Sequence, residues 1–234
     1  MRNFVSIIIP TYNEEKNLEN TLKAIRNQDY KNYEIIVSDS KSKDETRKIA
    51  KKYDAKVVVD EKRGMGAGRN FGARFARGDI LVFIDADTKM MTNTLSEIVK
   101  SFSKKRVVGV TCPVIPSKPT IKNLAIYLGY NNLVKVSIKS KKPHVGGMCV
   151  AYIKKYFFDS GGFDENLQAY EDVSISLKIS KFGKLFYTEK TFVVTSPRRI
   201  EEWGHFATVL KHFKMYLKFI SGRKITLKEY EPIR

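Results

Sequence analysis

Two aspartates, Asp85 and Asp87, follow a short apolar segment, residues 80–84, with only Ala86 between them. Alternate side chains of an extended strand point the same way, so we expect both carboxylates on one side of the chain. Like charges this close repel each other unless a cation or protons lie between them. Mg2+ and Mn2+ favour carboxylate and phosphate oxygens. The pair therefore predicts a divalent-metal and phosphate site; the alternatives are a solvated loop residue or a cap on the following helix.

A second acidic pair, Glu171 and Asp172, stands where an amphipathic helix is predicted to begin. Acidic residues there also interact favourably with the helix dipole, so a cap is one interpretation. The functional interpretation makes one carboxylate a general base within reach of an acceptor hydroxyl. The preceding SGGFDENL supplies glycines for a turn that would bring this pair back toward a sheet.

The segment RGMGAGRNFGARFARG has alternating glycines ahead of a predicted helix. Glycines let the backbone approach a phosphate closely, and a helix N-terminus attracts anions. A dinucleotide-binding Rossmann loop is the main alternative, because Gly66-x-Gly68 opens a helix. It fits poorly, since Phe71 occupies the third glycine position. A structural interpretation, in which this helix packs in a core while Arg69 and Arg74 face solvent, is compatible with either function.

The elements that would position these residues alternate along the first half of the chain. Strands are predicted over residues 4–10, from Tyr33, over 56–59 and over 80–84, and helices over 14–27, 43–53 and 66–77. This alternation predicts right-handed βαβ units, and so an α/β fold with a Rossmann-like, mostly parallel sheet flanked by helices. Ligands bind at the carboxyl ends of such strands. We therefore expect the polar clusters PTYNEE, SDSKSKDET and DAD to meet at one edge.

The second half of the chain has a different composition, because no Asp or Glu occurs between Glu97 and Asp159 while lysines are frequent. Prolines bracket an amphipathic segment that predicts a helix over residues 121–138. A strand is expected in VGGMCVAYI, a helix over 171–182, and short strands over 184–187 and 191–194. A C-terminal amphipathic helix is expected over 201–221, with Trp203, Phe206, Val209, Leu210, Phe213, Leu217 and Ile220 on one face.

Composition limits the partners and the compartment. The 234 residues, 42% of them hydrophobic, fit one compact domain, and the net charge of +18 requires an anionic partner. No nucleic-acid-reading motif is present, so we do not expect nucleic acid to be that partner. Cys112 and Cys149 lie in apolar surroundings outside any metal-binding pattern, as expected for reduced core residues of a cytoplasmic protein. No apolar run reaches the roughly 18 residues that a bilayer span requires.

Taken together, in this order and spacing, four segments resemble family 2 glycosyltransferases with the GT-A fold. They are SIIIPTYNEE, DSKSKDET, GAGRNFGARFARGDILVFIDAD and VGGMCVAYIKKYFFDSGGFDENLQAYEDVSISLKISKFG. The resemblance covers roughly residues 4–187. It implies an inverting enzyme that uses Mg2+ or Mn2+ and a UDP-, GDP- or dTDP-linked sugar donor.

The resemblance implies donor-binding residues at the ends of the first two strands. The base and ribose would be contacted by Pro10, Thr11, Tyr12 and Glu14, with the tyrosine ring available for stacking. Asp39 matches the aspartate that binds the base. The usual DDGSTDGT is here DSKSKDET, which leaves the identity of base and donor open.

Further matches fall on the acidic motifs. The resemblance implies that Asp85 and Asp87 hold the metal and the donor diphosphate, with Arg69 near that diphosphate. Asp172 matches the catalytic base of the E-D motif. Glu171, Gly146 and Gly147 would lie where acceptor and donor sugar meet.

The acceptor is expected to be a hydroxyl, because a phosphate oxygen is already ionised and needs little help from a base. The Q-x-x-R-W signature of processive members is absent, and SPRRIEEWG is only a distant echo of it, so one sugar per acceptor is expected. The alternatives are a polyprenyl-phosphate sugar synthase and a nucleotide-sugar-binding module without catalysis.

The lysine-rich region and the C-terminal helix suggest peripheral contact with an anionic membrane on its cytosolic face, near a lipid-linked acceptor. The alternative is that this helix packs its apolar face on the domain. We expect residues 1–200 to form the transferase domain and 201–234 to be a helix and tail that either belong to it or associate with a membrane.

Overall fold

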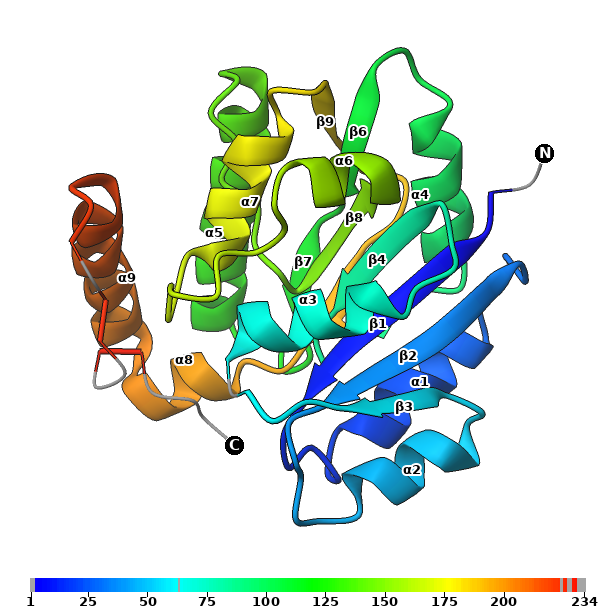
Figure 1. Cartoon of the computed structure of the whole chain (residues 1–234). Coiled ribbons are helices and arrows are strands. Elements are labelled where there is room, and N and C mark those ends of the chain that lie inside the picture. Colours follow the sequence, from blue (N-terminus) through cyan, green and yellow to red (C-terminus); the bar gives the residue numbers. More distant parts are fainter. Residues whose placement is uncertain (1–2, 63, 224, 227–228, 231–234) are drawn as a thin grey trace.

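The computed structural model describes residues 3–62, 64–223, 225–226 and 229–230. Its centre is a seven-stranded sheet in the order β3-β2-β1-β4-β8-β6-β9 (Figure 1). These strands are β1 Val5–Thr11, β2 Tyr33–Asp39, β3 Lys56–Val59, β4 Ile80–Ile84, β6 Val107–Thr111, β8 Cys149–Ile153 and β9 Lys184–Tyr187. Every pairing is parallel except those of β8, which runs antiparallel to both β4 and β6. The mostly parallel α/β sheet predicted from the sequence is confirmed.

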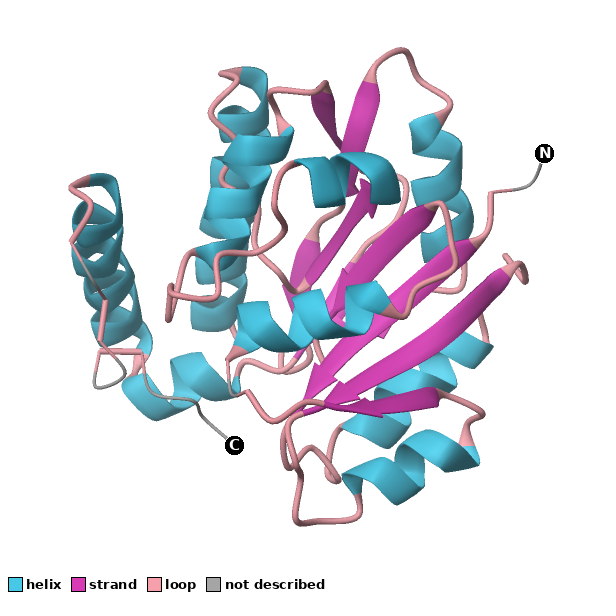
Figure 2. Cartoon of the chain, in the orientation of Figure 1, coloured by secondary structure: helices cyan, strands magenta, loops and turns pink. Residues whose placement is uncertain are grey.

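Helices cover both faces of this sheet (Figure 2). They are α1 Leu18–Arg26, α2 Thr46–Lys52, α3 Met65–Arg74, α4 Thr94–Phe102, α5 Ile121–Lys139, α6 Lys154–Asp159 and α7 Glu171–Ile179. The strand side chains divide by alternation: Ile7 and Ile9 join the core under α1, α2 and α4, whereas Ile8 joins the core under α3, α6 and α7. Both faces of β1 are therefore buried, which is why its sequence is continuously apolar.

A second, three-stranded sheet in the order β5-β10-β7 lies beside the first and was not predicted. It consists of β5 Thr88–Met90, β7 Val114–Pro116 and β10 Val193–Thr195. β10 overlaps the strand predicted over 191–194, whereas β5 and β7 were not predicted; each strand has only three residues, too few to leave a clear alternation in the sequence. The small sheet matters for function because β5 begins directly after Asp87 and β10 ends shortly before the helix that begins at Arg198.

The C-terminal helix predicted as one element over 201–221 is two: α8 Arg198–Trp203 and α9 His205–Ile220. Gly204 separates them with a φ of +81°, a left-handed value that glycine adopts without strain. Six of the seven apolar residues predicted to share one face are exposed on α9, whereas the seventh, Trp203, lies on α8 and packs in a core; the buried side chains of α9 are Thr208 and Met215. Within the described chain, none of the helices combines the length and apolar character that a bilayer crossing requires.

Candidate active site

The carboxyl ends of β2, β1 and β4 lie side by side, so the polar clusters that follow these strands meet as predicted. Thr11 and Asp39 occupy opposite positions in the β1–β2 pairing, and Thr11 Oγ1 donates a hydrogen bond of 3.1 Å to Asp39 Oδ2. Asp85 follows β4, the neighbour of β1 on its other side. Because β8 runs antiparallel to β4, with Cys149 opposite Ile84, the loop that precedes β8 reaches the same edge.

Asp39 organises the turn after β2. It is fully buried, and its Oδ1 accepts the Ser42 N–H at 2.9 Å. Lys41, which stands where the family usually has glycine, has a φ of +59°. This residue therefore adopts a left-handed conformation with a side chain, at a cost on the order of 1 kcal/mol. Asp39 remains the predicted base-binding residue, and Tyr12 lies half-buried immediately after β1.

Arg69 on α3 joins the two acidic motifs. Its Nη2 lies 2.8 Å from Asp85 Oδ1 and its Nη1 2.7 Å from Glu171 Oε1. The side chain is 2% exposed, so the expectation that Arg69 faces solvent is wrong. Burial alone would lower its pKa, but the charges of Asp85 and Glu171 outweigh burial and raise it. Among the described residues, Arg69 Nε has no hydrogen-bond partner.

A second arginine, Arg198, holds the other aspartate. Its Nε lies 3.1 Å from Asp87 Oδ2, and its Nη2 lies 2.7 Å from Glu14 Oε1. The small sheet brings it there: β10 pairs with β5 through Thr195 and Thr88, and Arg198 follows three residues after Thr195. In the sequence, SPRRIEEWG was notable only for its weak similarity to the Q-x-x-R-W signature of processive members. Nothing local in that segment indicated a contact with Glu14 or Asp87.

The two aspartates remain difficult to ionise in spite of these arginines. Burial, together with the charge of Asp85, raises the pKa of Asp87 to about 6, while Arg198 opposes the shift. Burial also raises the pKa of Asp85, against the attraction of Arg69. Further positive charge would therefore stabilise the ionised form of both aspartates, and their carboxylate oxygens suit a hard divalent cation.

A metal at this position would need ligands from outside the protein. In the described part of the chain, no three His, Cys, Asp or Glu side chains are arranged to hold a metal by themselves. Two carboxylates completed by substrate phosphates and water are a common way of holding Mg2+. The residues present fit such an ion, with Asp85 and Asp87 as its protein ligands.

Asp172 lies at the start of α7, on the side of the β8 loop. Its Oδ2 accepts the Gly147 N–H at 2.8 Å, and its Oδ1 accepts the Val173 N–H at 2.7 Å. The second bond satisfies a free N–H of the first helical turn, so the capping interpretation and the catalytic one are compatible. The neighbouring Glu171 is buried, and burial with the charge of Asp172 raises its pKa to about 7.

Glycines permit the close packing around these carboxylates. A Cβ at Gly147 would lie 2.2 Å from Arg69 Nη2, and one at Gly146 would lie 2.2 Å from Tyr130 Oη. The Gly146 N–H donates to that same hydroxyl at 2.9 Å. In α3, a Cβ at Gly68 would come within 3.2 Å of Pro10 Cβ, so this glycine lets α3 pack closely on β1. Its predicted approach to a phosphate stays a prediction.

The sequence predicted most of the residues that the fold brings together. Arg69 and Arg198 link Glu14, Asp85, Asp87 and Glu171 at one edge of the sheet, and Asp172 follows Glu171 directly. Three contributors were missed: Arg198, Tyr130 and Thr195. The first two are ordinary surface-type residues in the sequence, and Thr195 Oγ1 reaches Asp87 Oδ1 at 3.3 Å only because β10 pairs with β5.

Comparisons with known proteins agree with this architecture. The mannosyltransferase PcManGT from Pyrobaculum calidifontis, solved with GDP-Man and Mn2+, superposes with a TM-score of 0.74 at 24% identity, covering 100% of this chain and 68% of that one. This likeness shows that the chain has the same GT-A fold.

Two curated relatives are enzymes named for sugar transfer. A dolichyl N-acetyl-alpha-D-glucosaminyl phosphate 3-beta-D-2,3-diacetamido-2,3-dideoxy-beta-D-glucuronosyltransferase of Methanococcus voltae is 35% identical over 253 residues, covering 97% of this chain and 75% of that protein. A GalNAc(5)-diNAcBac-PP-undecaprenol beta-1,3-glucosyltransferase of Campylobacter jejuni is 29% identical over 201 residues, covering 80% of this chain. The chain spans only 63% of the latter's length.

The family comparison covers most of the elements that build the site. Residues 6–159, which include β1 from its second residue, β2, α3 and β4 with both aspartates that follow it, match the family model described as Glycosyl transferase family 2. The matched segment ends before α7, so Asp172 lies outside it. With this match over more than half of its residues, the chain belongs to glycosyl transferase family 2.

Proposed function

We propose that this protein transfers a single sugar from a nucleotide-sugar donor to a hydroxyl acceptor, with inversion at the anomeric carbon and with a divalent metal. One observation carries the proposal: acids from separate strand and helix ends, Asp85, Asp87 and Asp172, gather at one edge of the sheet. Arg69 ties the D-x-D pair to the E-D pair, so the two motifs form one site.

The donor half of the site is the edge formed by β1, β2 and β4. Pro10, Thr11, Tyr12 and Asp39 would bind the nucleoside, as in the family that the sequence resembles. Asp85 and Asp87 would hold Mg2+ or Mn2+. When bound, the ion neutralises the negative charge that develops on the leaving diphosphate.

The acceptor half is the loop before β8 and the start of α7. Asp172 would take the proton of the attacking hydroxyl, on the side of the donor sugar opposite its diphosphate, which inverts the anomeric centre. The Gly147 N–H, held 2.8 Å from Oδ2, fixes the direction of this carboxylate. Glu171 would keep Arg69 in place between the two halves.

Relatives named for undecaprenol-linked and dolichyl-linked substrates support a lipid-linked acceptor. We therefore place the enzyme at a membrane surface, on the cytosolic side, as a peripheral protein. Its cysteines are free and buried, as expected there. We also propose that residues 201–234 belong to the same domain as 1–200, because α8 crosses that boundary and supplies Arg198 to the site.

A thermal-shift panel with matched variants tests the proposal. UDP-, GDP- and dTDP-sugars are each added with and without Mn2+ to the wild type, Asp87→Asn, Asp172→Asn and the exposed control Asp159→Asn. We expect one nucleotide class to raise the Tm in a Mn2+-dependent manner in all but Asp87→Asn.

Activity completes the test. Transfer or hydrolysis of that nucleotide sugar should fall at least about 100-fold in Asp172→Asn and stay unchanged in Asp159→Asn. Full transfer by Asp172→Asn would reject the base assignment. Donor binding that is equal with and without Mn2+ would reject the metal site.

A further inference from the structure

The outer sides of α5 and α9 carry most of the large apolar side chains that the described surface exposes. On α9 they recur every three or four residues and form a stripe along the helix, which we call the α9 stripe: Phe206, Val209, Leu210, Phe213, Leu217 and Ile220. On α5 the exposed ones are Ile121, Leu124, Leu128, Leu133 and Val136. An exposed apolar surface of this extent marks an interaction site.

The α9 stripe is not the side by which the helix packs on the protein. Met215 and Thr208, on the opposite side of the helix, are buried, and Phe219 packs with Tyr170 in a small third core. Phe206 is 82% exposed and Phe213 58% exposed. The helix is thus apolar on two sides, one toward the domain and one toward the surroundings.

Charge indicates what covers the stripe. Neither α5 nor α9 contains an Asp or Glu, whereas lysines are spread along both, at positions 122, 135 and 139 and at 211, 214 and 218. A second copy of this chain would bring one lysine-rich face against another, and the like charges would repel. An anionic lipid surface offers complementary charge and an apolar interior together.

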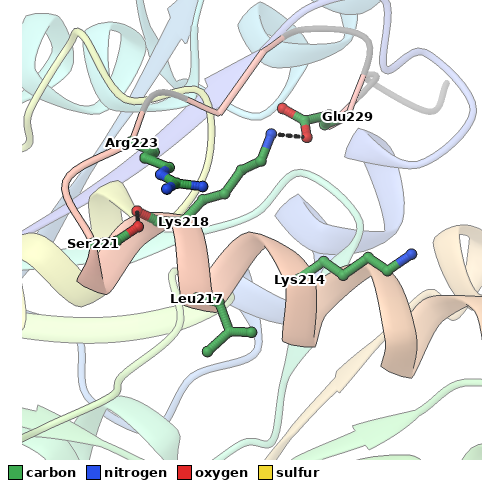
Figure 3. A pocket seen from close by; sticks show the side chains of 6 residues that line it. All are labelled: Lys214, Leu217, Lys218, Ser221, Arg223 and Glu229. Carbon is green, nitrogen blue, oxygen red and sulfur yellow. Dashed lines mark hydrogen bonds and ion pairs between the residues drawn. The ribbon is translucent and has the colours of Figure 1, made fainter.

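A hollow of about 470 Å3 at the end of α9 adds a second indication (Figure 3). It is lined by Lys214, Leu217, Lys218, Ser221, Arg223 and Glu229. Figure 3 shows Lys218 reaching to Glu229 while Leu217 points away from that pair. Three cations against one carboxylate make the hollow positive, and Leu217 belongs to both the hollow and the α9 stripe. Phosphate-bearing headgroups would lie in such a hollow when the stripe is inserted.

The inner sides of the same two helices contact the acceptor half of the site. Tyr130 of α5 accepts the Gly146 N–H at 2.9 Å, next to the glycine that holds Asp172. Tyr170, immediately before Glu171, donates to the His212 carbonyl of α9 at 2.7 Å. The two helices run side by side in Figure 1, linked at their first turns by His205 Nε2 and Asn123 Oδ1, 2.9 Å apart.

We propose that α5 and α9 form a bilayer-docking platform whose apolar side chains enter the headgroup boundary of an anionic membrane. The platform holds the acceptor half of the site about one helix diameter, roughly 10 Å, from the lipid. An acceptor that is anchored in the bilayer then meets Asp172 without leaving the membrane. This last step rests on the proposed function, whereas membrane docking does not.

Co-sedimentation with vesicles of phosphatidylcholine, with and without phosphatidylserine, tests the platform. The wild type should sediment with the anionic vesicles, less so as salt is raised, and little with the neutral ones. The double variant Phe206→Ser with Phe213→Ser, the stripe variant, should weaken partitioning at least about tenfold. Lys139→Gln with Lys214→Gln should weaken it about fivefold for each lysine removed.

Matched controls are available on remote surfaces. Met91→Ser removes an exposed apolar side chain outside α5 and α9, and Lys51→Gln removes a charge on α2, at the other end of the molecule in Figure 1. Both should sediment like the wild type. Circular dichroism melts confirm that each variant is folded, which is expected because every substituted side chain is exposed.

Three outcomes would overturn the proposal. The wild type could sediment equally with neutral and anionic vesicles, or the stripe variant could sediment as well as the wild type. The third is a concentration-dependent dimer of the wild type that the stripe variant does not form. A Mn2+-dependent thermal shift with a nucleotide sugar separates this proposal from the proposed function. The stripe variant should keep that shift while binding the vesicles more weakly. Vesicle binding without any such shift would reject the enzyme proposal and leave the platform intact.

Discussion

At the scale of residues, the D-x-D pair is stabilised by arginines from opposite halves of the chain. Asp85 pairs with Arg69 on α3, and Asp87 pairs with Arg198 on α8. Two carboxylates separated by one residue thus each face a different cation. Burial still outweighs these cations, and the pKa of both aspartates lies above the ordinary value. The site is therefore preorganised for one more positive charge.

Replacing Arg69 should be costly. In Arg69→Met, Asp85 and Glu171 would be left in a partly or fully buried position without a charged partner, and breaking a buried pair in this way typically costs about 3–5 kcal/mol. Urea unfolding of this variant measures the loss. Arg74→Met, on the exposed side of the same helix, is the matched control and should change the free energy of unfolding by less than about 0.5 kcal/mol. Equal losses in the two variants would contradict the role given to Arg69.

At the scale of elements, α9 is held to the domain by a small aromatic cluster. The rings of Tyr170, Trp203 and Tyr230 surround His212, and Tyr170 stacks on Phe219 with ring centroids 5.5 Å apart. Tyr170 has a φ of +65°, which turns the chain into α7 just before the acidic pair. The attachment of α9 and the placement of Asp172 thus share one residue.

The pH dependence of this attachment follows from His212. Burial, with the charges of Arg199 and His144 and against that of Asp172, lowers the pKa of His212 to about 4, from 6.5. Between these values the unfolded chain binds more protons than the folded one, so stability falls as pH falls through this window. The loss from pH 7 to pH 4 is up to about 3 kcal/mol.

Trp203, the only tryptophan in the chain, contacts the His212 ring and reports this change by its fluorescence. His212→Gln should remove this part of the pH dependence, because glutamine does not titrate. Urea titrations followed at Trp203 at several pH values between about 4 and 7 compare the two proteins. Identical pH profiles for wild type and variant would refute the assignment.

At the scale of the whole molecule, stability is unevenly distributed. The two faces of the main sheet bury large, continuous cores, whereas the third core under α9 contains, among the described residues, five buried ones: Ala169, Tyr170, Val173, Met215 and Ile225. Local opening is easiest where few apolar contacts hold an element. In Figure 1, α9 lies at the outer edge of the molecule, away from the main sheet.

Amide hydrogen exchange should reflect this distribution. We expect the amides of α9 to exchange at least about tenfold faster than those of β1 and β4, because α9 opens without disturbing the sheet. Anionic vesicles should slow exchange in α9 and leave β1 unchanged. Exchange in α9 as slow as in β4, without vesicles, would contradict this prediction.

The sequence by itself determined the elements and the edge at which chemistry occurs. The bounds of β3, β4 and β9 were predicted to the residue, because each strand is a short, largely apolar run bounded by polar or turn-forming residues. The meeting of Asp39 and Asp85 near Thr11 followed from one rule, that the carboxyl ends of neighbouring parallel strands share an edge. Such inferences need only local patterns and strand order.

Only the tertiary structure decided the remaining features. The antiparallel course of β8, the pairing of β5 with β10, the contacts of Arg198 and the outward direction of the α9 stripe all depend on which distant segments meet. The sequence of an apolar stripe is the same whether the stripe faces a core or a membrane. The sequence also does not show whether an arginine forms an ion pair with a carboxylate. Those choices are made by packing between segments far apart in the chain, which no local periodicity encodes.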